Sequence, residues 1–139
     1  MRHPLHPALV HFPIACWSLA SFADLASLVY GEALWRFAGL MMAIGVVMAV
    51  AAMATGTIEL IKLEQDHPAE DDVHRHLGWA LAAFCCYAAS LFLRWETRQL
   101  VAPGAFALGL SLLGFACLGV AGWLGGKLVY SHRLGSGRA

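Results

Sequence analysis

Four long apolar segments restrict what this chain of 139 residues can fold into. A bilayer core takes about 20 mostly apolar helical residues per crossing, and the segments at 8–30, 34–63, 73–93 and 100–130 reach or approach that length. Hydrophobic residues make up 60% of the sequence and charged residues 13%, whereas a soluble domain has roughly half and a quarter. The sequence therefore predicts an all-α membrane protein.

The connections between these segments are short, which predicts the topology. Gly31 and Glu32 separate the first two helices, and the stretch from Arg94 to Gln99 separates the last two, with Pro103 in the first turn of the fourth. Short connections make consecutive helices antiparallel neighbours. We therefore expect a single domain over residues 1–139, an up-down four-helix transmembrane bundle with both termini at the same end.

The distribution of Lys and Arg predicts the orientation. The end that holds the termini carries more of them than the opposite end, and such excess marks the cytoplasmic side of a multi-pass protein. The residues at the end with the termini are Arg2, Lys62, Arg75, Lys127, Arg133 and Arg138, and those at the opposite end are Arg36, Arg94 and Arg98. The expected surroundings are lipid, and a net charge of zero gives no electrostatic case for nucleic acid.

All seven histidines fall at the end that holds the termini: His3, His6, His11, His67, His74, His76 and His132. Neutral imidazole is a ligand for iron, copper, zinc and nickel. In a bundle, side chains on facing helices hold a cofactor between them. The clustering therefore predicts a cofactor or metal site at this end.

His11 and His76 lie in the first turns of the first and third helices, which are diagonal partners in a simple bundle. We expect them at similar depth and interpret them as axial ligands of a haem, with His6 and His132 nearby. His74 and His76 are two residues apart, roughly 200° around the helix, so only one of them points inward. The alternative is a transition-metal ion held by these five histidines with Glu59.

Two acidic residues lie within the apolar segments. Asp24 is about 20 Å along the helix from His11, near the opposite end of the bundle, and an ionisable residue at such depth is a candidate functional group. Either it serves a small-solute path, or it is structural and meets Arg94 or Arg98. Glu59 could pair with Lys127, orient a ligating histidine or bind a metal.

The opening motif HPLHPALVHFPIA at residues 3–15 and the closing motif GGKLVYSH at residues 125–132 resemble a bacterial membrane family catalogued as domain of unknown function 2231. Asp24, the segment ATG before Glu59 and a histidine opening the third helix agree with it. The family pattern has Asp at the position of Glu59, and Gly where this chain has Arg133. The resemblance implies a bacterial inner membrane, the histidines His6, His11, His76 and His132 as motif residues, and redox chemistry beside Rieske-type proteins.

Besides a small-solute path past Asp24, three functions remain open at this point. The first is a b-type haem protein or subunit that exchanges electrons with quinone or a Rieske-type partner. The second is a non-haem copper, zinc or iron protein. The third is a cofactor-free accessory subunit, whose Gly122 and Gly126 would pack against another subunit or a second copy. Nothing in the sequence resembles a phosphate loop, a nucleophile elbow or a catalytic triad, so no enzyme class is assigned.

Overall fold

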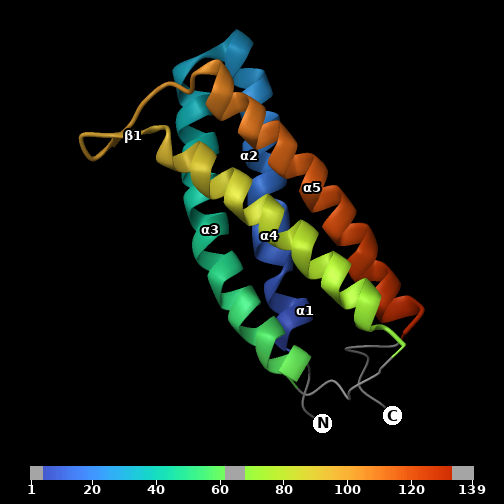
Figure 1. Cartoon of the computed structure of the whole chain (residues 1–139). Coiled ribbons are helices and arrows are strands. Elements are labelled where there is room, and N and C mark those ends of the chain that lie inside the picture. Colours follow the sequence, from blue (N-terminus) through green and yellow to red (C-terminus); the bar gives the residue numbers. More distant parts are fainter. Residues whose placement is uncertain (1–4, 62–67, 133–139) are drawn as a thin grey trace.

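The computed structural model describes residues 5–61 and 68–132. This part of the chain is helical apart from one small β-hairpin (Figure 1). The elements are α1 (Leu5–Leu9), α2 (His11–Tyr30), α3 (Glu32–Ile61), α4 (Glu70–Phe92), β1 (Trp95–Glu96), β2 (Gln99–Leu100) and α5 (Ala105–Tyr130). The all-α prediction is confirmed; residues 62 and 63 of the second predicted helix lie outside the described residues.

We call α1, α2 and α3 the N-terminal hairpin. Pro13 has no N–H for the carbonyl of Leu9, which explains why α1 ends there and α2 begins two residues later. At the far end α2 stops at Gly31, whose φ of 76° suits a residue without a Cβ. Gly31 alone separates α2 from α3, and its N–H donates to the carbonyl of Ser27 at 2.9 Å. A one-residue connection forces the two helices to run antiparallel.

We call α4 and α5 the C-terminal hairpin. The prediction that a helix begins near residue 100 was wrong, because β1 and β2 occupy residues 95–100 and pair Trp95 with Leu100. Thr97 and Arg98 form the turn with φ of 45° and 64°, as the two-residue turn of a tight hairpin requires. Pro103 therefore precedes α5, and Gly104 is the residue before its first turn.

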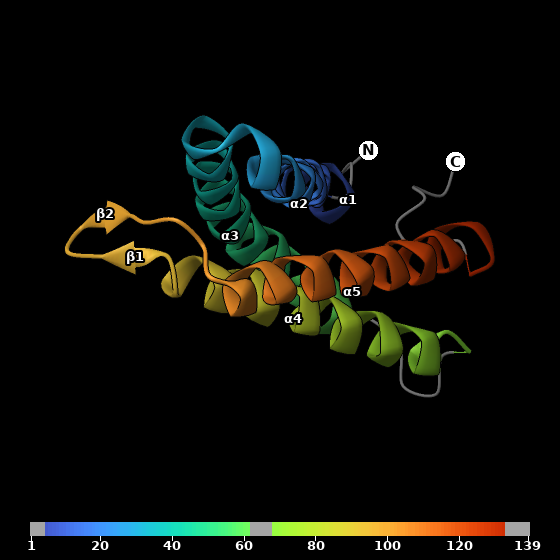
Figure 2. The ribbon, with the colours of Figure 1, turned by 90° about the horizontal axis from the view of Figure 1, so that it is seen from above.

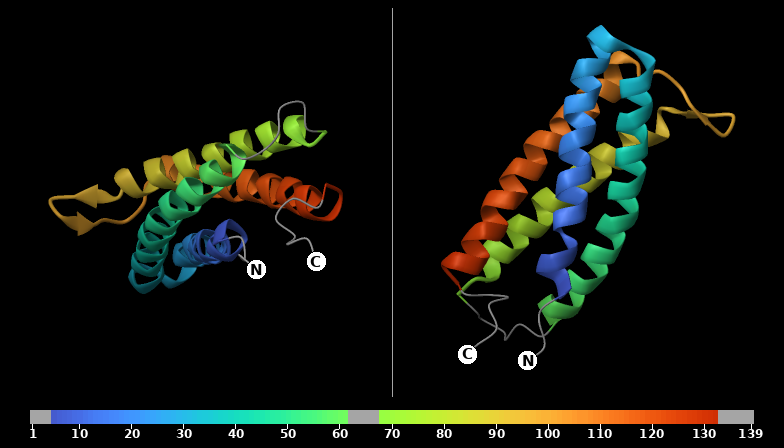
Figure 3. Two further views of the ribbon diagram at one scale, coloured as in Figure 1. Left: turned by 90° about the horizontal axis from the view of Figure 1, so that it is seen from below. Right: turned by 180° about the vertical axis from the view of Figure 1, so that it is seen from behind.

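The two hairpins lie face to face as two layers (Figure 2). Between the layers, α2 packs on α5 and α3 packs on α4. The beginning of α1, the end of α3, the beginning of α4 and the end of α5 all lie at one end of the bundle (Figure 3), which we call the histidine end. Small residues fill the contacts, with Ala20, Ala38 and Ala83 fully buried, so the helix backbones approach closely.

The outer surface is apolar, as a bilayer requires. Leu28, Val47 and Phe106 are 68%, 69% and 72% exposed, and they are three of many such residues. Within residues 5–61 and 68–132, three helical stretches are long and apolar enough to cross a membrane: Leu5–Tyr30, Glu32–Ile61 and Ala105–Tyr130. Helix α4 is not among them because its first turns are charged. A fourth crossing stays a prediction, supported by the packing of α4 along α5.

Candidate functional site

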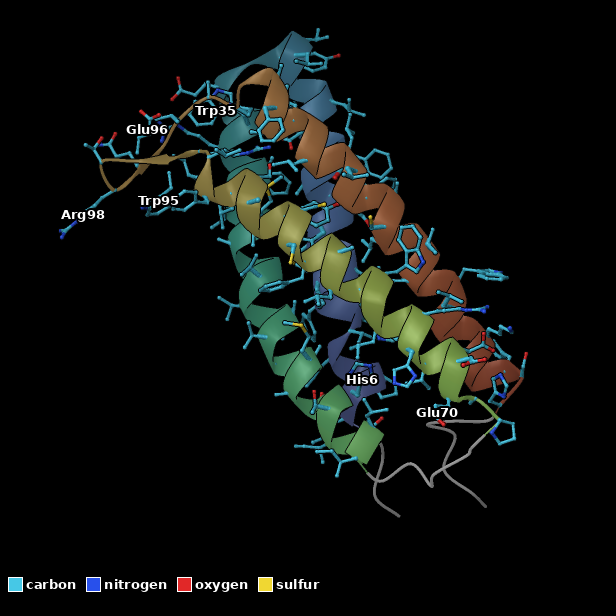
Figure 4. The ribbon with its side chains drawn as sticks, viewed as in Figure 1. His6, Trp35, Glu70, Trp95, Glu96 and Arg98 are labelled. Atoms are coloured by element: carbon cyan, nitrogen blue, oxygen red, sulfur yellow. The ribbon has the colours of Figure 1, made fainter. Side chains whose placement is uncertain are left out.

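The structure gathers five histidines at the histidine end: His6, His11, His74, His76 and His132. His3 and His67 lie outside the described residues. Figure 4 shows His6 and Glu70 at this end, whereas Trp35, Trp95, Glu96 and Arg98 lie at the opposite end. The histidines differ greatly in their surroundings, and those surroundings separate candidate ligands from surface residues.

His6 and His76 have the same environment on different hairpins. The Nδ1 atom of His6 donates to the carbonyl of Ala52 on α3 at 2.8 Å. The Nδ1 atom of His76 donates to the carbonyl of Ala121 on α5 at 2.9 Å. A carbonyl can only accept, so in each neutral ring the proton is on Nδ1 and the lone pair is on Nε2. This is the arrangement in which a histidine binds a metal through Nε2.

Two glycines make room for these rings. A Cβ on Gly56 would lie 2.9 Å from Cε1 of His6, and a Cβ on Gly125 would lie 3.2 Å from Cε1 of His76. Each glycine comes one helical turn after the alanine that accepts the hydrogen bond. Each imidazole therefore has its Cε1–Nδ1 edge against a glycine of the neighbouring helix, and it is held there by a backbone carbonyl.

The side chains of His6 and His76 lie within electrostatic range of each other. Both are partly buried. The histidine end thus presents two oriented imidazoles, one from each hairpin.

The predicted pairing of His11 with His76 is not what the structure assembles. His11 is exposed on α2, and among residues 5–61 and 68–132 its side chain forms no hydrogen bond or ion pair. His74 is exposed as well, so of the two neighbours on α4 it is His76 that points inward. His6, expected as a secondary residue, hydrogen-bonds to the neighbouring helix as His76 does, and a role for His11 as a ligand stays a prediction.

The larger metal site expected from His6, His11, His74, His76, His132 and Glu59 is not assembled either. In the part of the chain that the structure describes, no three His, Cys, Asp or Glu side chains come close enough together to hold a metal ion. Glu59 is half-buried on α3, three residues after Gly56. The expected pairing of Glu59 with Lys127 does not form, because Lys127 binds Asp72 instead.

Asp72 ties the beginning of α4 to the end of α5. Lys127 Nζ lies 2.8 Å from Asp72 Oδ2, and His132 Nε2 donates to the same oxygen at 2.9 Å. Hydrogen bonds from Lys127 and then from His132 hold the pKa of Asp72 below its usual value of 3.8. His132 is therefore engaged in a polar cluster at the histidine end rather than available as a ligand.

Asp24 forms a buried ion pair at the opposite end. Arg94 Nη1 and Nη2 donate to Asp24 Oδ1 and Oδ2 at 2.6 and 2.8 Å, and the two side chains are 0% and 1% exposed. Arg94 Nη2 also donates to Ser90 Oγ at 3.0 Å, and Ser90 donates to the carbonyl of Ala107 at 2.6 Å. The expected pairing of Asp24 with Arg94 is confirmed.

An aromatic pair fills the bundle between these two polar sites. The rings of Trp17 and Tyr87 stack with their centroids 4.7 Å apart and an interplanar angle of 14°. The Tyr87 hydroxyl donates to the carbonyl of Trp17 at 3.1 Å and also hydrogen-bonds with Ser21, which in turn contacts Ser111. The stack is buried and lies along the bundle between the histidine pair and the ion pair of Asp24 with Arg94.

Sequence reasoning could have identified His6 from two signals. Gly56 and Gly125 stand four residues after Ala52 and Ala121, so the same small-residue spacing recurs on both partner helices. His6 and His76 are 70 residues apart, as are Asp24 and Arg94. The roles of Asp72 and Ser90 had no comparable signal, since their partners are set by helix packing.

The fold and the apolar outer surface define the class: this is an all-α membrane protein with a histidine pair at one end of its bundle. The chain belongs to the family described as a predicted membrane protein, DUF2231, whose match covers residues 2–138. The comparison with curated proteins gave no match, and neither did the comparison with solved structures.

Proposed function

We propose that this protein binds a b-type haem between its two hairpins, with His6 and His76 as axial ligands, and exchanges electrons with a redox partner. The observation that carries the proposal is the matched geometry of the two rings, each with Nδ1 bound to a carbonyl and with Nε2 unbonded by any other described residue. When bound, the haem would supply a one-electron couple. The potential of such a couple depends on the axial ligands, their hydrogen bonds and burial.

The number of ligands favours haem over a bare metal ion. A structural zinc site needs four protein ligands and a catalytic one needs three. Residues 5–61 and 68–132 bring no such set together. Haem needs only two from the protein, because the porphyrin supplies four nitrogens. A pair of imidazoles therefore favours haem, and copper, zinc or iron without porphyrin is the weaker alternative.

The residues around the pair have separate tasks. The carbonyls of Ala52 and Ala121 fix the orientation of the imidazoles and increase their basicity. Gly56 and Gly125 leave space for the rings. The apolar helices limit the access of water, which affects a haem potential through the local dielectric.

The partner we propose is a quinone or a Rieske-type protein that approaches at the histidine end. The protein would lie in a bacterial inner membrane with this end on the cytoplasmic side, as the excess of Lys and Arg in the sequence indicates. The stack of Trp17 on Tyr87 supports exchange at one end, because it fills the path toward the opposite end.

Single-residue variants test the assignment. In protein purified with its native cofactor, His6→Ala and His76→Ala should each remove the low-spin spectrum, whereas His11→Ala and His74→Ala should retain it. The two controls lie at the same end of the bundle but are exposed. Loss of the spectrum in His11→Ala with retention in His6→Ala would refute the assignment.

One observation favours a second candidate, the cofactor-free accessory subunit. A Cβ on Gly109, Gly119 or Gly122 of α5 would meet no atom within 4 Å, so this helix can accept a close neighbour from another subunit or a second copy. This function predicts a colourless protein that co-purifies with partner chains.

A further inference from the structure

The two hairpins follow one pattern of residues. A shift of 70 residues carries His6, Trp17 and Asp24 of the N-terminal hairpin onto His76, Tyr87 and Arg94 of the C-terminal hairpin. A shift of 69 residues carries α3 onto α5, and there the residues are identical at four contact positions: Ala38 and Ala107, Gly45 and Gly114, Ala52 and Ala121, Gly56 and Gly125.

The contacts of these residues repeat as well. The hydrogen bonds of His6 and His76 go to equivalent alanines, as described above. A Cβ on Gly45 would meet the ring of Trp17, and a Cβ on Gly114 would come within 2.9 Å of the ring of Tyr87. The glycines thus play the same part in both hairpins, which chance similarity of apolar helices does not explain.

Equivalent residues of the two hairpins also touch each other at two levels of the bundle, where Trp17 stacks on Tyr87 and Asp24 pairs with Arg94. At a third level, His6 lies within electrostatic range of His76. In a twofold arrangement, residues that meet their own equivalents lie beside the axis. Because α2 and α4 both start at the histidine end, this axis runs along the bundle (Figures 1 and 3).

We propose that the chain is a tandem repeat of one helical hairpin with a twofold pseudo-axis. In this proposal, Asp24 and Arg94 make an N-terminal hairpin pair with a C-terminal hairpin and not with another N-terminal hairpin. Pairing of two N-terminal hairpins would bring two Asp24 carboxylates together at a fully buried level. Pairing of two C-terminal hairpins would bring together two guanidinium groups. Like charges in a desolvated contact disfavour that partner, which is how charged positions select between similar surfaces.

The hydrogen bonds around the ion pair of Asp24 and Arg94 are made by a serine that only the C-terminal hairpin carries. Ser90 receives a hydrogen bond from Arg94 and donates to Ala107. Its equivalent is Ala20, and both are 0% exposed. The equivalent of Ala107 is Ala38, also buried. If the pseudo-axis is real, the whole network can be moved to the other hairpin by four exchanges, Ala20→Ser, Asp24→Arg, Ser90→Ala and Arg94→Asp.

Thermal unfolding and oligomeric state of the full chain in mild detergent test this proposal, and neither depends on a cofactor. Asp24→Arg and Arg94→Asp should each lower Tm by roughly 10 °C or abolish the monomer, because each leaves like charges buried. The fourfold exchange should recover a monomer and at least half of the lost Tm. Glu32→Arg is the matched control, since it reverses a charge in the exposed pair with Arg36; it should shift Tm by no more than about 2 °C.

Two results would overturn the proposal. One is a fourfold variant that is no more stable than the single variants, because the two places would then not be equivalent. The other is a pair of single variants that remain monomeric with the wild-type Tm, because the charges would then not govern how the hairpins pair.

Discussion

Replacing Gly56 by alanine should displace the imidazole of His6 and weaken the proposed site. The new Cβ would lie 2.9 Å from Cε1 and 3.0 Å from Nδ1 of His6. Carbon atoms in contact are separated by about 3.5 Å or more, so the ring must move by roughly 0.6 Å. Such a move stretches the 2.8 Å bond to Ala52 beyond the usual limit of about 3.2 Å.

The energetic cost follows from two opposing effects. Overpacking of a well-filled contact costs about 1–3 kcal/mol, and alanine returns up to about 1 kcal/mol because it is a better helix former than glycine. The net loss in the free energy of unfolding should therefore be about 1–2 kcal/mol. Cofactor occupancy should fall as well, because a ring displaced from its hydrogen bond to Ala52 no longer holds Nε2 in the orientation that the proposed site requires.

The C-terminal hairpin offers a graded series for the same assay. Gly125→Ala brings a Cβ to 3.2 Å from His76 and should have a smaller effect, whereas Gly126→Ala meets nothing within 4 Å and should be neutral or slightly stabilising. Thermal unfolding and the cofactor-to-protein ratio are measured in the same detergent for all three variants. Equal behaviour of Gly56→Ala and Gly126→Ala in both measurements would refute the reasoning.

Three further predictions concern the rest of the bundle. Gly45→Ala would place a Cβ in steric overlap with Nε1 of Trp17, so it should destabilise the protein by about 1–3 kcal/mol in thermal unfolding, whereas Gly109→Ala, in open space, should not. Tyr87→Phe removes the hydroxyl that bonds Trp17 and Ser21 and should cost about 1 kcal/mol by chemical denaturation; no change in the midpoint would contradict the network. The pKa of Asp72 is lowered in the folded protein, so the ionised carboxylate stabilises the fold at pH values above 3.8. This stabilisation is lost as the pH falls through the folded-state pKa. The Tm difference between wild type and Asp72→Asn should therefore shrink from pH 6 to pH 3.

Helix positions could be predicted from the sequence because membrane spans need long apolar runs, and the breaks at Gly31 and after Phe92 are local in origin. The β-hairpin at residues 95–100 could not, because Thr97 and Arg98 adopt positive φ without the glycine or asparagine that usually signals such a turn. The polar sequence between the last two helices predicted a connection but not its form.

The histidine end was predictable from topology alone, whereas the choice among its histidines depended on the spacing shared by the two hairpins, which we missed. His11 lies in the opening motif as His6 does, and the position of α3 shows that His6 faces Ala52 and Gly56. The pairing of Asp24 with Arg94 was one of two pairings that the sequence predicted, because Arg94 and Arg98 both fall at the end of the bundle where Asp24 lies. Asp72 was missed because its partners, Lys127 and His132, lie at the far end of another helix.

Titration of the purified, cofactor-free protein with haemin in mild detergent, followed in the Soret region, tests the central claim most directly. The paired imidazoles predict saturation at one haem per chain with a low-spin spectrum, and no such spectrum in the double variant His6→Ala/His76→Ala. Absence of saturable binding, or the same low-spin spectrum in the double variant, would contradict the assignment of His6 and His76 as haem ligands.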